Sequence, residues 1–174
     1  MNLRHKIAIG ALVLVSSSLT AFLGKWEGNG QNTAYADKLA RGLPTVCKGI
    51  TKHTSPYPVV VGDYWSDARC AEVEHLVIEK GQLALADCLT NQAIGQNTFD
   101  ALTSHGHNFG VPTTCASRAV GLINAGRIAE GCMALARAPD GTPVWSYVTD
   151  AQGKKRFVPG LYARRLAEAE LCAK

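Results

Sequence analysis

The sequence lacks the patterns that mark several common enzyme and binding classes. No CxxC pair occurs, which argues against a zinc ribbon or a thioredoxin-type redox site. No GxSxG segment occurs either, so an α/β-hydrolase is not expected. Dense basic runs are also absent. The most basic stretch, Lys154-Lys155-Arg156, is short and typical of a solvated loop, so nucleic acid is not an expected partner.

The overall composition indicates one folded domain. The chain has 174 residues, of which 47% are hydrophobic, and it contains no evident internal repeat or low-complexity tract. Its net charge is +4, from 18 basic and 14 acidic side chains. A mild positive charge favours polyanionic partners such as a cell wall or a membrane surface.

The six cysteines predict disulfides. Their even number, together with an N-terminus typical of exported proteins, predicts three bridges formed in an oxidising compartment. Six cysteines allow 15 connectivities. Cys70 and Cys88 are predicted on one long helix, which would separate them by about 27 Å. Bridged Cα atoms lie within about 7 Å, so these two should not pair with each other. The cysteines are Cys47, Cys70, Cys88, Cys115, Cys132 and Cys172.

The N-terminal segment has three interpretations. Arg4, His5 and Lys6 precede an uncharged stretch from Ile7 to Gly24, which as a helix would span about 27 Å, close to the thickness of a bilayer core. A cleaved signal peptide is disfavoured by poor cleavage sites. A permanent anchor is disfavoured because Gly, Ser and Thr dilute the stretch. We favour a marginal anchor that can leave the bilayer, with the rest of the chain outside.

The remaining pattern predicts an α+β fold, mostly helical, with a small N-terminal β-hairpin lobe. A hairpin is expected over Leu39–Thr51. Ser66 should cap a long helix whose buried face carries Cys70, Val73, Val77, Ala84 and Cys88. Asn97 should cap a second helix. Two shorter helices are predicted around 115–123 and 128–137, then a loop over 139–160 and a last helix over 161–172.

Two acidic residues near the N-terminus suggest glycosidic cleavage. This reaction needs one protonated carboxyl group for the leaving oxygen and a second, ionised one on the other side of the sugar. Glu27, at the end of a helix, and Asp37, beside a hairpin, can supply such a pair. Two acids ten residues apart are nevertheless common, so the pair alone does not identify an enzyme.

The motifs around these acids resemble the phage-type lysozymes, glycoside hydrolase family 24, and especially endolysins of lambdoid phages. The resemblance begins with Glu27-Gly28, Tyr35-Ala36-Asp37, Thr45 and Gly49-Ile50-Thr51. It continues through Phe99-Asp100-Ala101-Leu102 and Asn108-Phe109-Gly110 to the final Gly160-Leu161-Tyr162-Ala163-Arg164-Arg165 with Glu168. The matching segments keep their order over residues 24 to 172.

The resemblance implies a lysozyme-like fold with a substrate cleft between two lobes, and a muramidase that needs no cofactor or metal. Its reaction would be hydrolysis of the β-1,4 bond between N-acetylmuramic acid and N-acetylglucosamine in peptidoglycan, for host cell lysis. Glu27 would be the general acid, Asp37 would lie beside the attacking water and Thr45 would position that water. Arg164 would pair with a carboxylate near the start of the domain. By the same resemblance, the disulfides would be Cys47–Cys70, Cys88–Cys115 and Cys132–Cys172.

The chain departs from the family in its spacing. Nine residues separate Glu27 from Asp37 and seven separate Asp37 from Thr45, both more than is common in the family. The exact role of Asp37 is therefore open, and inversion is expected only by analogy.

The resemblance also implies that residues 1–24 are a signal-arrest-release segment, joined to a catalytic domain over 25–174. Such a segment tethers the enzyme to the host inner membrane and then releases it to the periplasm, here as a monomer. No cysteine lies in residues 1–46, so activation by disulfide exchange with this segment is excluded. Activation would come from refolding of the released segment.

Other functions are kept as alternatives. His105 and His107 lie two residues apart and would not share a helix face, so a metal pair is disfavoured. A Cys–His peptidase is disfavoured because paired cysteines leave no thiol. A non-catalytic, disulfide-stapled periplasmic binding protein or inhibitor would use Trp26, Trp65 and Trp145 as interface anchors. Release of reducing ends from cell wall distinguishes the enzyme from this binder.

Overall fold

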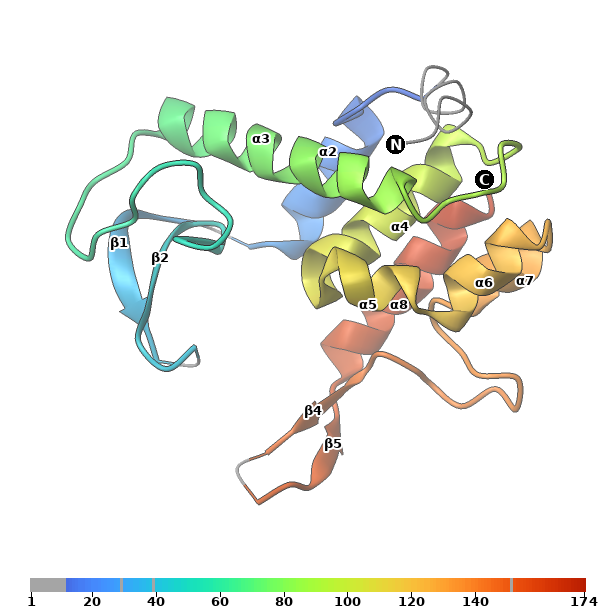
Figure 1. Cartoon of the computed structure of the whole chain (residues 1–174). Coiled ribbons are helices and arrows are strands. Elements are labelled where there is room, and N and C mark those ends of the chain that lie inside the picture. Colours follow the sequence, from blue (N-terminus) through green and yellow to red (C-terminus); the bar gives the residue numbers. More distant parts are fainter. Residues whose placement is uncertain (1–11, 29, 39, 151) are drawn as a thin grey trace. The chain divides into compact units, whose positions relative to one another are not determined.

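The computed structural model describes residues 12–28, 30–38, 40–150 and 152–174, and divides them into two compact units. The helical unit comprises residues 12–20 together with Gly81–Lys174, and the β unit comprises Ala21–Lys80 (Figure 1). Two helices, α2 (Ser17–Trp26) and α3 (Asp67–Ala86), continue from one unit into the other. The mixed architecture, mostly helical with a small antiparallel sheet, is the fold class that the sequence predicts.

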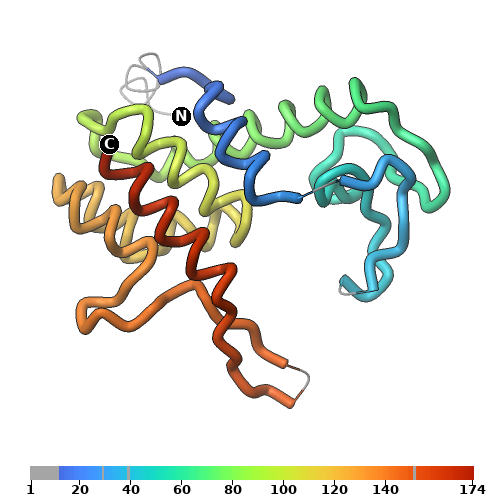
Figure 2. The backbone as a smooth tube through the Cα atoms, turned by 180° about the vertical axis from the view of Figure 1, so that it is seen from behind, coloured from blue at the N-terminus to red at the C-terminus, as the bar shows by residue number. Residues whose placement is uncertain are grey.

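The helical unit is built around two long helices. Helix α4 (Gln96–Phe109) and helix α8 (Pro159–Cys172) lie side by side in both views (Figures 1 and 2). Shorter helices pack against them, and fully buried Phe99, Leu102 and Ile123 fill the space between. Burial of each such side chain contributes about 1.5–3 kcal/mol to folding. The shorter helices are α5 (Val111–Cys115), α6 (Arg118–Asn124) and α7 (Ile128–Met133).

Of the two predicted helix caps, the one at Ser66 is correct and the one at Asn97 is wrong. Ser66 caps α3, because its hydroxyl accepts from the Arg69 N–H at 3.3 Å. Asn97 does not cap α4. That position belongs to Gly95, and the helix begins at Gln96. The predicted buried face of α3 is also shifted: Ala84 is exposed, whereas its neighbour Leu85 is fully buried.

The β unit contains a three-stranded antiparallel sheet in the order β1 (Gln31–Asp37), β2 (Leu43–Cys47) and β3 (Ile50–Thr51). A hairpin is thus present, but its first strand, β1, ends before the predicted range Leu39–Thr51 begins, so only β2 and β3 fall inside that range. Arg41 and Gly42, both with positive φ, form the turn between β1 and β2. One sheet face carries buried Val46 and Ile50, which belong to an apolar core with Trp65.

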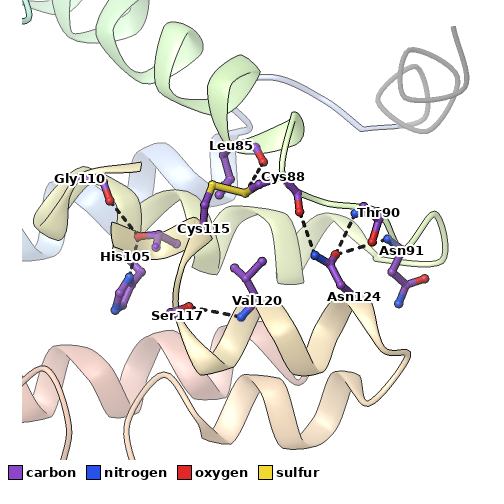
Figure 3. The surroundings of a disulfide bond; sticks show 11 residues. Leu85, Cys88, Thr90, Asn91, His105, Gly110, Cys115, Ser117, Val120 and Asn124 are labelled. Atoms are coloured by element: carbon purple, nitrogen blue, oxygen red, sulfur yellow. Dashed lines mark hydrogen bonds between the residues drawn. A yellow bond between two sulfur atoms is a disulfide. The ribbon is translucent and has the colours of Figure 1, made fainter. Parts of the chain in front are cut away.

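All six cysteines form disulfides, and the three pairs are those that the family resemblance implies. Cys70 and Cys88 belong to different bridges, as predicted. Figure 3 shows the Cys88–Cys115 bridge beside Asn124, whose side chain donates to the Cys88 carbonyl at 2.8 Å and accepts from the Thr90 N–H at 2.8 Å. The bridge therefore joins two segments that polar contacts also hold together.

The segment predicted as a loop over 139–160 contains a second hairpin. Strands β4 (Tyr147–Thr149) and β5 (Lys155–Phe157) pair in the register Tyr147↔Phe157 and Thr149↔Lys155. The hairpin extends away from the helices of its unit in both views (Figures 1 and 2). Expecting only a loop here was wrong, because three-residue strands carry too short a pattern to identify.

The described part of the N-terminal segment is packed into the helical unit. Leu19 is fully buried, and Leu12 and Leu14 contact the apolar core. Helix α2 has only ten residues, and no helix in the described ranges is long and apolar enough to cross a membrane. Residues 1–11, including the basic flank of the predicted anchor, lie outside the described residues.

Candidate active site

Glu27 lies at the C-terminal end of α2. Its N–H donates to the Leu23 carbonyl at 2.9 Å, so the helical hydrogen-bond pattern continues to Glu27. Gly28, with a φ of 66°, then ends the helix. The side chain is half-buried, and its Oε1 atom is shielded from solvent. One oxygen of this carboxyl group is thus held inside the protein.

Asp37 ends strand β1 at the edge of the turn. Its carbonyl accepts from the N–H groups of Ala40 at 3.1 Å and Gly42 at 2.7 Å, and its Oδ1 lies 3.4 Å from the Ala40 nitrogen. These contacts close the turn around Asp37. Its half-buried side chain is therefore fixed by backbone geometry on both sides of the turn.

Thr45 lies on β2 on the same sheet face as Asp37. The register pairs Asp37 with Leu43 and Tyr35 with Thr45, and side chains two residues apart along a strand share a face. Asp37 and Thr45 are therefore diagonal neighbours, roughly 7–8 Å apart between Cα atoms. Thr45 also pairs with Thr51 of β3, is only 3% exposed, and donates its hydroxyl to the Leu43 carbonyl at 3.0 Å.

A turn and a close backbone approach lie between these residues. Asp37 pairs with Leu43, so the residues between them form the turn before Thr45. Before β1, Gly30 passes so close to Cys47 that an added Cβ atom would lie 2.8 Å from its carbonyl carbon. Only glycine fits there, a requirement that the sequence pattern did not reveal.

Arg164 belongs to a buried polar network in the helical unit. Its Nε lies 3.4 Å from Glu168 Oε1, which also accepts from Arg165 Nη2 and Ser104 Oγ at 2.7 Å each. Burial raises the pKa of Glu168, and the two guanidinium groups oppose that rise. Partners of Arg164 thus include Glu168 on the same helix and Ser104 of α4. Pairing of Arg164 with a carboxylate near the start of the domain stays a prediction.

His105 is a buried structural residue. Its Nδ1 lies 2.8 Å from the Thr114 hydroxyl, and its ring contacts those of Phe109 and Trp145 at 4.9 Å each. Burial, together with the nearby arginines, lowers the pKa of His105 to about 3, so the ring is neutral at ordinary pH. Within the described residues, no group of three or more His, Cys, Asp or Glu side chains could hold a metal ion.

Comparisons with known proteins define the family. The Phage lysozyme family model matches residues 24–168. A SAR-endolysin of Pseudomonas phage phiKMV is 32% identical over 146 residues, which cover 84% of this chain and 80% of that protein. The solved endolysin from Escherichia coli O157:H7 phage FAHEc1 is 28% identical, with a TM-score of 0.74 over 92% of both chains. The muramidase domain of SpmX from Asticaccaulis excentricus shares the fold, with a TM-score of 0.74 at 21% identity over 92% of this chain and 97% of that one.

The chain therefore belongs to the phage lysozyme family and is a glycoside hydrolase. The family match begins three residues before Glu27 and includes Asp37, Thr45 and Arg164. A non-catalytic binding protein or inhibitor is not favoured by these comparisons.

Proposed function

We propose that this protein is an endolysin whose β unit carries the catalytic groups Glu27, Asp37 and Thr45. It hydrolyses the β-1,4 bond between N-acetylmuramic acid and N-acetylglucosamine in peptidoglycan. The observation that carries the assignment is the sheet register, which puts Asp37 and Thr45 on one face as diagonal neighbours. The third group, Glu27, directly follows Trp26, the last residue of helix α2, and lies within the same unit.

The chemistry follows from two carboxyl groups in different protonation states. Glu27 donates its proton to the glycosidic oxygen as that bond breaks. Asp37, ionised, accepts a proton from a water molecule that attacks the anomeric carbon from the opposite side. The Thr45 hydroxyl already donates to Leu43, so its oxygen is left to accept a hydrogen bond from that water. We expect inversion, which requires roughly 6.5–9.5 Å between the two carboxyl groups.

Replacement of the proposed acid tests this mechanism. Glu27→Gln keeps the side chain's size but removes the proton, and should lower lysis of purified peptidoglycan by about 10²–10⁴-fold. Glu72→Gln, an exposed change in the same unit, is the matched control and should retain activity. A folded Glu27→Gln variant with near wild-type lysis would show that the acid lies elsewhere.

We further propose that the N-terminal segment is a signal-arrest-release segment that leaves the inner membrane and docks on the helical unit in the periplasm. Its relative from phage phiKMV carries that description. The docked arrangement supports refolding. The Ser16 hydroxyl donates to Asp100 Oδ2 at 2.6 Å and caps α2 by accepting from the Leu19 N–H at 3.0 Å. Gln96 exchanges two hydrogen bonds with the Val13 backbone, at 2.8 and 2.9 Å.

Docking and membrane insertion can be separated because different residues serve them. Ser17 and Ser18 are exposed in the docked segment. Changing both to Leu should favour the bilayer, where each Leu contributes about −0.6 kcal/mol at a helix centre, without altering buried contacts. Asp100→Ala leaves the sequence of the segment unchanged but removes the carboxylate that accepts from Ser16. It should destabilise the docked arrangement by about 1–3 kcal/mol. Both variants should shift full-length protein from the soluble periplasmic fraction to the membrane fraction.

Fractionation with N-terminal sequencing gives the outcome. Wild type should appear at full length in both fractions, and dissipating the membrane potential should increase the soluble form. Soluble enzyme that begins near Phe22 or Lys25 would instead show ordinary signal cleavage.

A further inference from the structure

The β4–β5 hairpin carries a row of aromatic rings along one of its faces. Tyr147 and Phe157 are directly opposite each other in the register, with ring centroids 5.5 Å apart, and Tyr162 of α8 continues the row 5.8 Å from Phe157. Tyr147 and Phe157 are 41% and 44% exposed. Three contiguous rings, two of them more than two-fifths exposed, thus form a continuous aromatic surface on this small hairpin and the adjoining helix.

Cations lie at the two ends of this row. Lys155 pairs with Thr149 and lies two residues from Phe157, towards the hairpin tip. Because alternate residues of a strand share a face, Lys155 lies on the same face as Phe157. At the other end, Arg137 donates from Nε to the Tyr162 hydroxyl at 2.9 Å. We refer to Lys155, Tyr147, Phe157, Tyr162 and Arg137 together as the aromatic face.

We propose that the aromatic face is an accessory binding site for the acidic glycan strands of peptidoglycan. The flat C–H surface of a pyranose ring packs on aromatic rings, while Lys155 and Arg137 attract the free carboxylates of the peptide stems that the strands carry. This inference rests on the proposed hydrolysis of peptidoglycan and assigns a second contact with the same polymer. The helical unit carries this face, whereas the candidate catalytic groups belong to the β unit.

The chemistry of the hairpin favours a glycan over a membrane surface. A hairpin that inserts into a bilayer presents apolar side chains at its tip. Here the described tip residues are polar, and Asp150 accepts from the backbone of Lys154 and forms an ion pair with Arg156 at 2.8 Å. The apolar surface lies along the strands, in an orientation that suits an extended polymer.

Binding to purified, insoluble peptidoglycan tests the proposal. Full-length soluble protein carrying Glu27→Gln is mixed with sacculi, and the bound fraction is measured by sedimentation. Adding Tyr147→Val and Phe157→Val removes the rings but keeps residues that favour strands, and should weaken binding about tenfold. Lys155→Ala should weaken binding about threefold at low ionic strength and reduce its salt dependence.

Matched controls keep the result interpretable. Val148→Ala changes an exposed apolar residue on the opposite face of the same strand, and Lys174→Ala removes an exposed charge elsewhere in the unit. Both should bind as the parent does, and all variants should keep the parent's melting temperature. Unchanged sacculus binding by the Tyr147→Val/Phe157→Val variant overturns the proposal. The same variants are also tested for binding to phosphatidylglycerol vesicles. If the Tyr147→Val/Phe157→Val variant lost binding to these vesicles but not to sacculi, the aromatic face would be a lipid-binding surface and the proposal would be wrong.

Failure of the proposed function would look different. If wild type released no reducing ends while the aromatic face still governed sacculus binding, hydrolysis would be wrong and the accessory site would stand.

Discussion

The two units of this protein bury polar groups very differently. Among the described residues, the helical unit encloses buried charged and polar side chains such as Asp100, His105, Arg165 and Glu168. In the β unit, Thr45 is the one buried polar residue of this kind, set in an otherwise apolar core. Several of these groups are hydrogen-bonded: Glu168 accepts from Ser104 and Arg165, and Asp100 accepts from Ser16 and Gln96. Such buried networks help to specify packing. The buried Thr45 hydroxyl donates to the Leu43 carbonyl at 3.0 Å, and under the proposed function its oxygen positions the attacking water.

The largest expected effect is a loss of activity in the β unit without a loss of stability. Asp37→Asn should lower peptidoglycan hydrolysis by up to about 10⁴-fold, because the amide cannot accept the proton of the attacking water. The free energy of unfolding should stay within about 0.5 kcal/mol of wild type, since the change is conservative and the turn is closed mainly by backbone bonds. Turnover and denaturant unfolding measure the two quantities, with the exposed Asp87→Asn as the control.

A mild loss of activity in Asp37→Asn would show that the lengthened turn has moved the role of the base to another group. Partial activity of Asp37→Asn with full loss in Glu27→Gln would keep the acid and reject only the base.

The next effect concerns stability. Arg165 is fully buried against Glu168, so Arg165→Met leaves that carboxylate without its shortest ion pair and should cost about 3–5 kcal/mol. In the β unit, Lys48→Met breaks the partly buried Lys48–Glu74 pair, whose atoms lie 3.4 Å apart, and should cost less than about 1 kcal/mol. Urea denaturation gives both values. Equal costs would mean that the units do not differ in how they use charge.

A smaller effect is the pH dependence contributed by His105. Its pKa is about 3 in the folded protein and near 6.5 when unfolded, so the unfolded chain binds more protons between these values. This residue's contribution to stability is therefore present above pH 6.5 and is lost as the pH falls towards 3, with a slope of up to about 1.4 kcal/mol per pH unit. His105→Asn should flatten the wild-type curve from pH 6 to 4, whereas exposed His53→Asn in the β unit should not. Parallel curves for wild type and His105→Asn would contradict the assigned burial of the neutral ring.

Local signals in the sequence predicted local structure well. Ser66 was recognisable as a helix cap because a cap depends on the next three residues alone. Asn97 was not a cap, because Gly95 holds that position while the Gln96 side chain bonds to the distant Val13. Strand β1 was missed since its QNTAYAD sequence has no apolar alternation, and its pairing with β2 forms it instead.

The site was predictable only in part. The disulfide pairs and the three candidate catalytic residues came from the family resemblance, because neither cysteine count nor two acids ten residues apart specifies them. The contact of Ser16 with Asp100 could not be predicted, since it joins residues far apart in the chain. The aromatic face could not be predicted, because strands β4 and β5, which pair Tyr147 with Phe157, are too short to recognise in the sequence. Ser16 meets Asp100 across 84 positions, and Tyr147 reaches Tyr162 only through Phe157.

The most direct measurement of the central claim is the identity of the chain ends that the enzyme creates. Purified peptidoglycan is digested with the soluble wild-type protein, and the new reducing ends are identified by mass spectrometry after borohydride reduction. The account predicts reduced N-acetylmuramic acid at every new end, with none formed by Glu27→Gln. New ends of N-acetylglucosamine, anhydro-sugar ends, or cleaved peptide bonds with intact glycan strands would contradict it.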